Sequence, residues 1–221
     1  GAIVGTPDFL GMLREETRKA GVVLIFDEVM TSRMGPGGVQ GIRGIRPDMT
    51  TLGKFWGGGF AFGAFGGSRE LMRHLDVRTG GALSQAGTFN NNVITMTAGL
   101  VGARDVYSPE ACVRLNALGD RLREQLNELG HSLQLPFQAT GLGGVMNTHW
   151  NVKPVTEPSV VAPVGATVRR LFQLEMIERG YYVAQRGMIN LSLPMQESDL
   201  AGFVAAVRDY LGRYGSLLPR T

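Results

Sequence analysis

This 221-residue sequence contains very little cysteine. Its single cysteine, Cys112, excludes a disulfide within the chain. A lone thiol is typical of proteins kept in a reducing compartment. We therefore expect a cytoplasmic protein. Lysine is also scarce, because Lys19, Lys54 and Lys153 are the only three in the chain.

Charge and hydropathy exclude two further classes of protein. The formal net charge is only +3, and no basic run or basic patch interleaved with aromatic residues is present, so we expect no nucleic-acid partner. No apolar stretch approaches the roughly 20 residues of a membrane-spanning helix. Apolar residues make up 43% of the chain, enough for a buried core in one or two domains. No metal site is predicted.

Helical and strand patterns alternate in the first half of the sequence. Thr6 and Pro7 form a capped helix start, and Gly21 is placed to end that helix. Residues 22–26 form a continuous apolar run, which predicts a strand buried on both faces, as in a parallel sheet. Three further elements are expected in this half: strands at 50–52 and 61–65, and a helix at 93–106.

The second half begins with Ser108 and Pro109, which open a long amphipathic helix expected to end at Gly130. We therefore place a domain boundary near residue 107, giving domains 1–107 and 108–221. The remaining expected elements are a strand at 141–150, a loop at 151–164, a helix at 166–179, strands at 181–184 and 188–193, and a last helix capped by Ser198.

Asp27 and Lys54 carry the strongest chemical signal. Asp27 follows the apolar run, and ligands of such sheets bind beyond the carboxyl ends of the strands. Lys54 lies in a glycine-rich loop shortly afterwards. A carboxylate that pairs with a pyridine nitrogen, and a lysine that forms a Schiff base, are the two groups that pyridoxal phosphate requires of a protein. Taken singly, Asp27 fits a turn cap and Lys54 fits a solvated surface lysine.

The flanking segments strengthen this interpretation. The motifs FDEVMT (26–31), RPDMTTLGK (46–54), GAFGG (63–67) and AGTFNNN (86–92) occur in that order. They closely resemble class III aminotransferases, the branch that includes glutamate-1-semialdehyde aminomutase and the β-amino acid transaminases. The resemblance runs from about residue 7 to about residue 214. It covers only the second half of those enzymes, which are roughly twice as long.

The resemblance implies a fold-type-I α/β enzyme: part of the α/β/α large domain (1–107) and a C-terminal α+β domain (108–221). It implies that Lys54 and Asp27 are catalytic, with pyridoxal 5′-phosphate as the cofactor. Val29 is expected to pack against the cofactor ring, whereas Glu28 is expected to make a structural contact. The phosphate-binding loop and ring-stacking aromatic residue of the family's first half have no counterpart in this sequence.

Two other residues receive roles by the same resemblance. Thr88 is expected to reach the cofactor phosphate of a partner subunit, so the active form would be a homodimer or a larger homo-oligomer; an ordinary helix entry would also explain it. Arg186 is expected to bind a substrate carboxylate, in the two-pronged geometry that guanidinium groups favour. A surface arginine in a hairpin turn explains Arg186 equally well.

The predicted activity is transfer of an amino group between an amine or amino acid and a keto acid or aldehyde, by a ping-pong route. One alternative is intramolecular amino transfer of the glutamate-1-semialdehyde aminomutase type, which uses the same aspartate and lysine. Another is a non-catalytic binding or dimerisation module. The aminomutase and the aminotransferase differ in the active-site entrance, which this sequence does not contain, so both activities stay open. Retention of the cofactor would distinguish an enzyme from the non-catalytic module.

Overall fold

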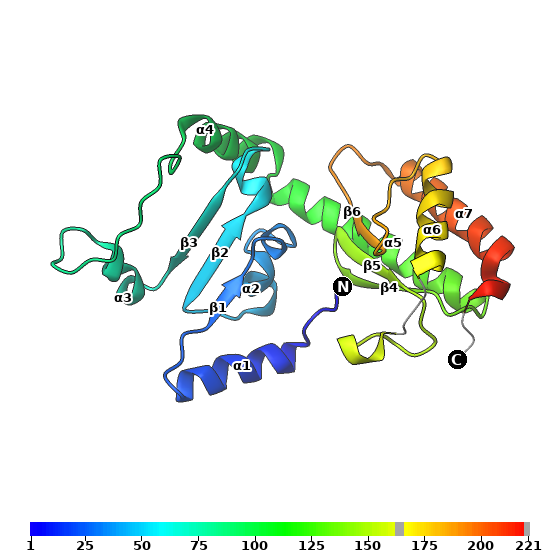
Figure 1. The fold of residues 1–221 in the computed structure, drawn as a ribbon, viewed down its shortest axis with the longest axis horizontal. Helices are drawn as coiled ribbons and strands as arrows, with labels where there is room; N and C mark the ends of the chain where they lie inside the picture. Colours follow the sequence, from blue (N-terminus) through cyan, green and yellow to red (C-terminus); the bar gives the residue numbers. More distant parts are fainter. Residues whose placement is uncertain (162–165, 219–221) are drawn as a thin grey trace. The chain divides into compact units, whose positions relative to one another are not determined.

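The computed structural model describes residues 1–161 and 166–218, and it divides into two compact units (Figure 1). The N-terminal unit contains Gly5–Val113. The C-terminal unit contains Gly1–Val4 and the described residues from Arg114 onward. Within the described part of the chain, no helix is both long and apolar enough to cross a membrane.

The N-terminal unit is built around a three-stranded sheet. Its helices and strands are α1 (Pro7–Lys19), β1 (Ile25–Asp27), α2 (Gly38–Arg43), β2 (Met49–Gly53), β3 (Gly63–Gly67), α3 (Arg69–Met72) and α4 (Val93–Val101). Short 3₁₀ turns lie at Thr31–Arg33, Lys54–Gly57 and Arg73–Leu75, and a π-helical turn at Gly102–Val106 follows α4.

The strand order is β1-β2-β3, with β2 in the centre. β1 runs parallel to β2, and Asp27 is opposite Thr51. β3 runs antiparallel to β2, with Gly53 opposite Gly63. The carboxyl ends of β1 and β2 therefore lie at the same end of the sheet, which brings the segment after Asp27 beside the segment after Gly53.

The start of α1 is as the sequence predicts. The hydroxyl of Thr6 accepts a hydrogen bond from the backbone N–H of Phe9 at 3.2 Å, and Pro7 occupies the first helical position. Pro7 suits this position because an N–H in the first turn has no partner within the helix. α1 ends at Lys19, and Gly21 adopts φ +65°, a conformation in which glycine avoids strain.

The strand predicted at 22–26 is shorter and less buried than expected. Only residues 25–27 form β1, and the side chains of Val22, Val23 and Ile25 are 54%, 45% and 53% exposed. An apolar strand is buried only if other elements pack against both faces of its sheet. β1 lies at the edge of its sheet, and no described segment covers those three side chains. The strand predicted at 61–65 also begins later, at Gly63.

The C-terminal unit has a second three-stranded sheet with helices. α5 (Pro109–Ser132) begins in the N-terminal unit and continues into this one. The other elements are β4 (Gln138–Leu142), β5 (Val145–His149), a 3₁₀ turn at Pro158–Val160, α6 (Ala166–Glu178), β6 (Met188–Asn190), α7 (Glu197–Tyr214) and a 3₁₀ turn at Gly215–Leu217. The strand order is β4-β5-β6, and both pairings are antiparallel.

Several boundaries in this unit differ from the sequence prediction. The helix expected to stop at Gly130 continues for two more residues. The single strand expected at 141–150 is a hairpin of two strands, because Gly143, at φ +52°, turns the chain between them. Residues 181–184 form no strand, and β6 ends at Asn190. The cap of α7 is Gln196, in a reciprocal pair with Asp199, rather than Ser198.

The described core lies mainly in the C-terminal unit. Trp150 and Phe172 pack edge to face, with ring centroids 5.3 Å apart, and Tyr210 packs against both. The long side of α5 facing this core is buried as the amphipathic pattern predicts, through Leu115, Leu122, Leu126 and Leu129. In the N-terminal unit, by contrast, α4 is almost entirely apolar yet leaves Val93, Ile94, Met96, Leu100 and Val101 exposed.

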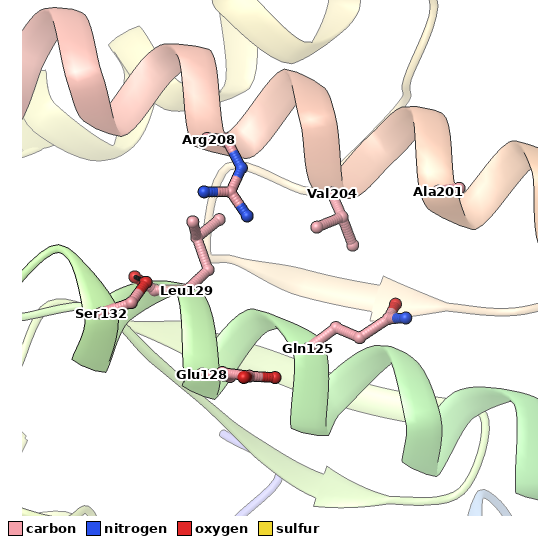
Figure 2. A pocket seen from close by; sticks show the side chains of 7 residues that line it. All are labelled: Gln125, Glu128, Leu129, Ser132, Ala201, Val204 and Arg208. Carbon is pink, nitrogen blue, oxygen red and sulfur yellow. Dashed lines mark hydrogen bonds between the residues drawn. The ribbon is translucent and has the colours of Figure 1, made fainter.

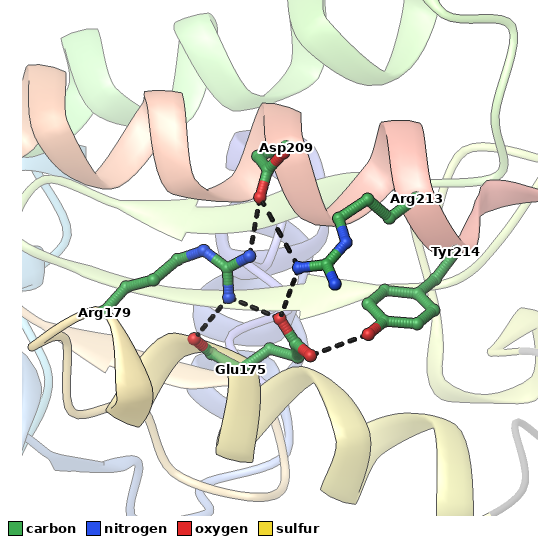
Figure 3. Close-up of polar contacts among 5 residues, drawn as sticks. All are labelled: Glu175, Arg179, Asp209, Arg213 and Tyr214. Atoms are coloured by element: carbon green, nitrogen blue, oxygen red, sulfur yellow. Dashed lines mark hydrogen bonds and ion pairs between the residues drawn. The ribbon is translucent and has the colours of Figure 1, made fainter.

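A charged cluster joins α6 to α7 (Figure 3). Arg179 pairs with the carboxylates of Glu175 and Asp209, and Arg213 lies 3.7 Å from Glu175. The hydroxyl of Tyr214 donates to Glu175 at 2.8 Å. The Glu175 side chain is only 12% exposed. The hydrogen bond from Arg179, then that from Tyr214, holds the pKa of Glu175 below its usual value.

We expect Glu175→Gln to lower the free energy of unfolding by about 1–2 kcal/mol at pH 7, because it removes a hydrogen-bonded, mostly buried charge. A carboxyl whose pKa is depressed on folding stabilises the protein above its unfolded-state pKa. This stabilisation is lost as the pH falls through the lower folded-state pKa. The difference between wild type and variant should therefore shrink below about pH 4 in urea unfolding curves. A pH-independent difference would contradict this assignment, and Tyr214→Phe should show a smaller loss.

Candidate active site

Asp27 lies at the carboxyl end of β1 and is held by its neighbours. One carboxylate oxygen, Oδ1, accepts hydrogen bonds from the Val29 backbone N–H and from the Thr51 hydroxyl, each at 3.0 Å. These two bonds, in that order, and then the positive charge of Lys54 hold the pKa of Asp27 below its usual value. Asp27 is exposed, and within the described residues its Oδ2 has no hydrogen-bond partner. An ionised, fixed carboxylate with one open oxygen suits a protonated ring nitrogen.

Glu28, the next residue, organises the loop that follows the strand. Its carboxylate is 1% exposed and accepts from the backbone N–H groups of Val39 and Gln40, at 3.2 and 2.7 Å, and from the Thr31 hydroxyl. The first two donors lie in α2, where unpaired N–H groups favour an anion. The sequence-based expectation that Glu28 makes a structural contact agrees with this geometry.

Lys54 begins the 3₁₀ turn Lys54–Gly57, directly after β2. It is exposed, and its φ of 56° lies in the left-handed region. A non-glycine residue in this region costs about 1–3 kcal/mol and commonly marks a functional position. Thr51, three residues earlier, donates to Asp27. The structure therefore brings Asp27 and Lys54 to the same end of the sheet. They are close enough for the charge of Lys54 to lower the pKa of Asp27.

The strain at Lys54 gives a stability prediction. We expect Lys54→Gly to be more stable than Lys54→Ala by about 1 kcal/mol, because only glycine adopts this φ without a Cβ penalty. Neither variant has the amine, so its loss does not contribute to the difference. Chemical unfolding of the two variants measures it.

Lys19, at the end of α1, provides the matched control. There Lys19→Ala should be more stable than Lys19→Gly, because alanine is the better helix former. Equal stability of Lys54→Ala and Lys54→Gly would contradict the left-handed conformation.

Val29 packs against the start of the lysine turn. A Cβ built on Gly53 would lie 3.3 Å from Val29 Cγ1 and 3.3 Å from the carbonyl oxygen of Phe62. This close packing places Val29 at the carboxyl ends of β1 and β2, beside Asp27 and Lys54.

Thr88 lies in the segment before α4 and is exposed. The structure gives this threonine no hydrogen bond to Asp27 or Lys54 within the described residues. Asn92 caps α4, since its side-chain oxygen accepts from the N–H groups of Ile94 and Thr95 at 3.0 and 3.3 Å. The neighbours of Thr88 line a hollow of about 660 Å³ between this segment and β3, with Phe65, Phe89, Asn90, Asn91, Asn92 and Thr95 among the lining residues.

Arg186 lies in the C-terminal unit, at a tight turn. The Gly187 N–H donates to the Ala184 carbonyl at 2.8 Å, and the Ala184 N–H donates to the Met188 carbonyl at 3.2 Å. Gly187 adopts φ +88°, and its carbonyl accepts from the Thr148 N–H of β5 at 2.9 Å. The turn presents the exposed Arg186 side chain to solvent, with no acidic partner within the described residues. The guanidinium donates only a long hydrogen bond, of 3.6 Å, to the Met188 sulfur within the described residues, and an exposed guanidinium without an acidic partner suits carboxylate binding.

A second hollow, of about 490 Å³, lies in the C-terminal unit between α5 and α7 (Figure 2). Its lining residues are Gln125, Glu128, Leu129, Ser132, Ala201, Val204 and Arg208. No hydrogen bond or ion pair links these side chains (Figure 2), and the hollow contains none of the residues singled out by the sequence. Across residues 1–161 and 166–218, no group of three or more His, Cys, Asp or Glu side chains is placed to hold a metal ion.

Comparison with solved structures defines the fold. The chain superposes on a β-phenylalanine aminotransferase from Variovorax paradoxus with a TM-score of 0.97 and 44% identity, covering 100% of this chain and 51% of that one. An ω-transaminase from Sphaerobacter thermophilus gives a TM-score of 0.87 and 37% identity, covering 94% and 48%. The fold is that of the fold-type-I pyridoxal phosphate enzymes.

The family follows from the sequence comparisons. The Aminotransferase class-III profile matches residues 1–187, and this chain belongs to that family. Among curated relatives, the beta-phenylalanine transaminase of Variovorax paradoxus is 44% identical over 220 residues, covering 100% of this chain and 50% of the relative. A glutamate-1-semialdehyde 2,1-aminomutase of Bordetella avium is 39% identical over 202 residues, covering 91% and 44%. The chain spans about half the length of these relatives.

Two contributors to the site were not predicted. Thr51 holds the Asp27 carboxylate, and the parallel pairing of the two strands was the signal that would have placed it there. Ser32 accepts a hydrogen bond from the Trp56 side chain, between two loops 24 residues apart in sequence. No local pattern in the sequence indicates such a bond.

Proposed function

We propose that the protein is a pyridoxal phosphate-dependent aminotransferase, which moves an amino group between an amine or amino acid and a keto acid or aldehyde by a ping-pong route. The observation that carries this proposal is the placement of Asp27 and Lys54 together at the carboxyl ends of paired strands. Family membership and the fold support it. In this proposal, residues 1–107 belong to the cofactor-binding large domain and 108–221 form the small domain.

The residues of this chain fit the cofactor. Asp27 would pair with the ring nitrogen through the carboxylate that Val29 N–H and Thr51 hold ionised. Val29, beside Gly53, would pack against the ring. The cofactor supplies an electron sink for the bond broken at the substrate Cα. Lys54 would hold the cofactor covalently and then, as a free amine, carry the proton between the substrate Cα and the cofactor C4′ carbon.

Thr88 would contribute to the phosphate site of a second copy of the chain, which makes a homodimer or larger homo-oligomer the proposed active form. Its exposed position in a segment that lines a hollow supports this role. The proposed location is the cytoplasm, supported by the single, buried Cys112.

Arg186 is the proposed site for the substrate carboxylate. Its exposed guanidinium has no acidic partner within the described residues, and the turn that carries it is anchored to β5. The name of the Variovorax relative indicates activity on β-phenylalanine, a β-amino acid. We therefore propose β-amino acids as the donor class to test first. We expect Arg186→Ala to affect carboxylate-bearing donors more than simple amines.

The proposal is tested by the visible absorption spectrum of the purified chain with added pyridoxal phosphate. We expect a band that bleaches when β-phenylalanine is added and returns when a keto acid follows. Conversion of glutamate-1-semialdehyde without a separate acceptor would instead indicate aminomutase activity, which the 39% identical relative makes the second candidate. The absence of any cofactor-dependent band would favour a non-catalytic module.

A further inference from the structure

The 3₁₀ turn that carries Lys54 is held by two other segments, α4 and the loop that follows Asp27. On one side, the backbone of α4 contacts it closely: a Cβ built on Gly99 would lie 2.2 Å from the Trp56 carbonyl oxygen. A Cβ on Gly58 would lie 2.4 Å from the Ala98 carbonyl. On this side the turn cannot move closer to the helix.

On the other side, the turn is tied to the loop that follows Asp27. The indole Nε1 of Trp56 donates to the Ser32 hydroxyl at 3.0 Å. Ser32 is 7% exposed, and its backbone N–H donates to the Glu28 carbonyl at 3.0 Å. Glu28 directly follows Asp27 and is itself fixed by its buried carboxylate.

The segments that carry Asp27 and Lys54 are therefore connected in two places. One connection between the Asp27 and Lys54 segments is the pairing of β1 with β2 and the Thr51–Asp27 hydrogen bond. The other is the Trp56–Ser32 bond, which lies beyond the ends of both strands. Strand pairing alone fixes β2 only up to Gly53, whereas Lys54 follows it in a strained conformation.

We propose that Trp56 and Ser32 are positioning residues, whose hydrogen bond holds Lys54 in register with Asp27 during amino transfer. This inference deepens the proposed function and rests on it. Trp56 acts through the backbone of its own turn: one residue, Phe55, separates it from Lys54, and the close contact with α4 blocks movement of the turn toward that helix. Loss of the bond frees the lysine turn to move away from Asp27, while the strand pairing stays intact.

The test compares Trp56→Phe and Ser32→Ala with a control variant. The control loses a different hydrogen bond to the 3₁₀ turn Thr31–Arg33, which contains Ser32, and keeps the Trp56–Ser32 bond. Tyr107→Phe is that control, because the Tyr107 hydroxyl donates to the Arg33 carbonyl at 2.8 Å and the ring contact with Phe55 is retained. The full chain is mixed with pyridoxal phosphate, and the visible band that depends on Lys54 is titrated with pH. The bleaching rate with an amine donor is measured on the same samples.

We expect Trp56→Phe and Ser32→Ala each to shift the pH midpoint of the band and to slow bleaching about fivefold to tenfold, the effect of one lost hydrogen bond. Apparent donor affinity should stay within about twofold. The double variant should equal the stronger single variant, since both remove the same bond. Tyr107→Phe should titrate and react like wild type.

Wild-type midpoints and rates in both single variants would overturn the inference, and so would an equal change in Tyr107→Phe, which would show a general loss of stability. If Trp56→Phe does not fold, Ser32→Ala decides the question by the same criteria. A wild-type chain with no band dependent on Lys54 would overturn the proposed function itself, and this inference with it. A wild-type band with unaffected variants overturns the inference alone.

Discussion

Lys54→Ala is expected to lower the rate of the half-reaction with an amine donor by at least about a thousandfold. The substitution removes both the group that bonds the cofactor and the base that moves the Cα proton, and general acid–base catalysis alone contributes about 10²–10⁴. The fold should remain, because Lys54 is exposed and within the described residues its side chain makes no hydrogen bond. Single-turnover absorbance measurements with preformed cofactor complex give the rate directly.

The scarcity of lysine makes this experiment easy to control. Lys19 pairs with Glu16 on the surface of α1 at 2.8 Å, and Lys153 lies in an exposed loop, so alanine at either position should leave the rate unchanged. Reduction of the cofactor complex with borohydride, followed by peptide mapping, should label Lys54 and neither of the others. Labelling of Lys19 or Lys153 in the active protein would contradict the assignment.

Asp27→Asn is expected to lower the same rate by about 10²–10³, the range measured when one well-placed electrostatic contact is removed from an active site. The amide has the shape of the carboxylate, and its oxygen still accepts from Val29 and Thr51. It lacks the negative charge that would favour a protonated ring nitrogen. In the wild type the depressed pKa of Asp27 keeps this charge at neutral pH, so it should be lost only in acid, below the usual range of a carboxyl group.

Asp48→Asn provides a matched control for that charge. Asp48 precedes β2, accepts from the Leu24 N–H at 2.7 Å and pairs with Arg14 at 3.0 Å, so its pKa is also lowered. The loss of this carboxylate should reduce stability and leave the spectrum of the bound cofactor unchanged. Asp27→Asn should instead shift the cofactor band. Equal behaviour of the two variants would indicate that Asp27 has only a structural role.

The sequence predicted the parts of the fold that depend on local chemistry. The Thr6 cap, the Pro109 helix start and the buried side of α5 depend on short-range patterns, and the structure has all three. The pair Asp27 and Lys54 was predictable for a similar reason. Asp27 ends β1 and Lys54 directly follows β2, and the parallel pairing of these strands brings their carboxyl ends together.

The features that the sequence did not predict are set by tertiary contacts, that is, by what packs against a segment. Residues 22–26 have the composition of a strand buried on both faces, yet Val22 and Val23 are exposed. Residues 181–184 look like a strand, but the Tyr181 N–H donates instead to the Met176 carbonyl of α6 at 2.8 Å. The Trp56–Ser32 bond joins two irregular loops, whose approach is set by tertiary structure.

The three-stranded sheet of the N-terminal unit has open edges on β1 and β3 among the described residues. An edge strand offers free N–H and carbonyl groups to any extended peptide, and Ile25 adds exposed apolar surface beside one such edge. During synthesis, this region would therefore be a template for wrong strand pairing until a further strand or subunit covers it. The yield at high expression would therefore depend on how these two edges are covered.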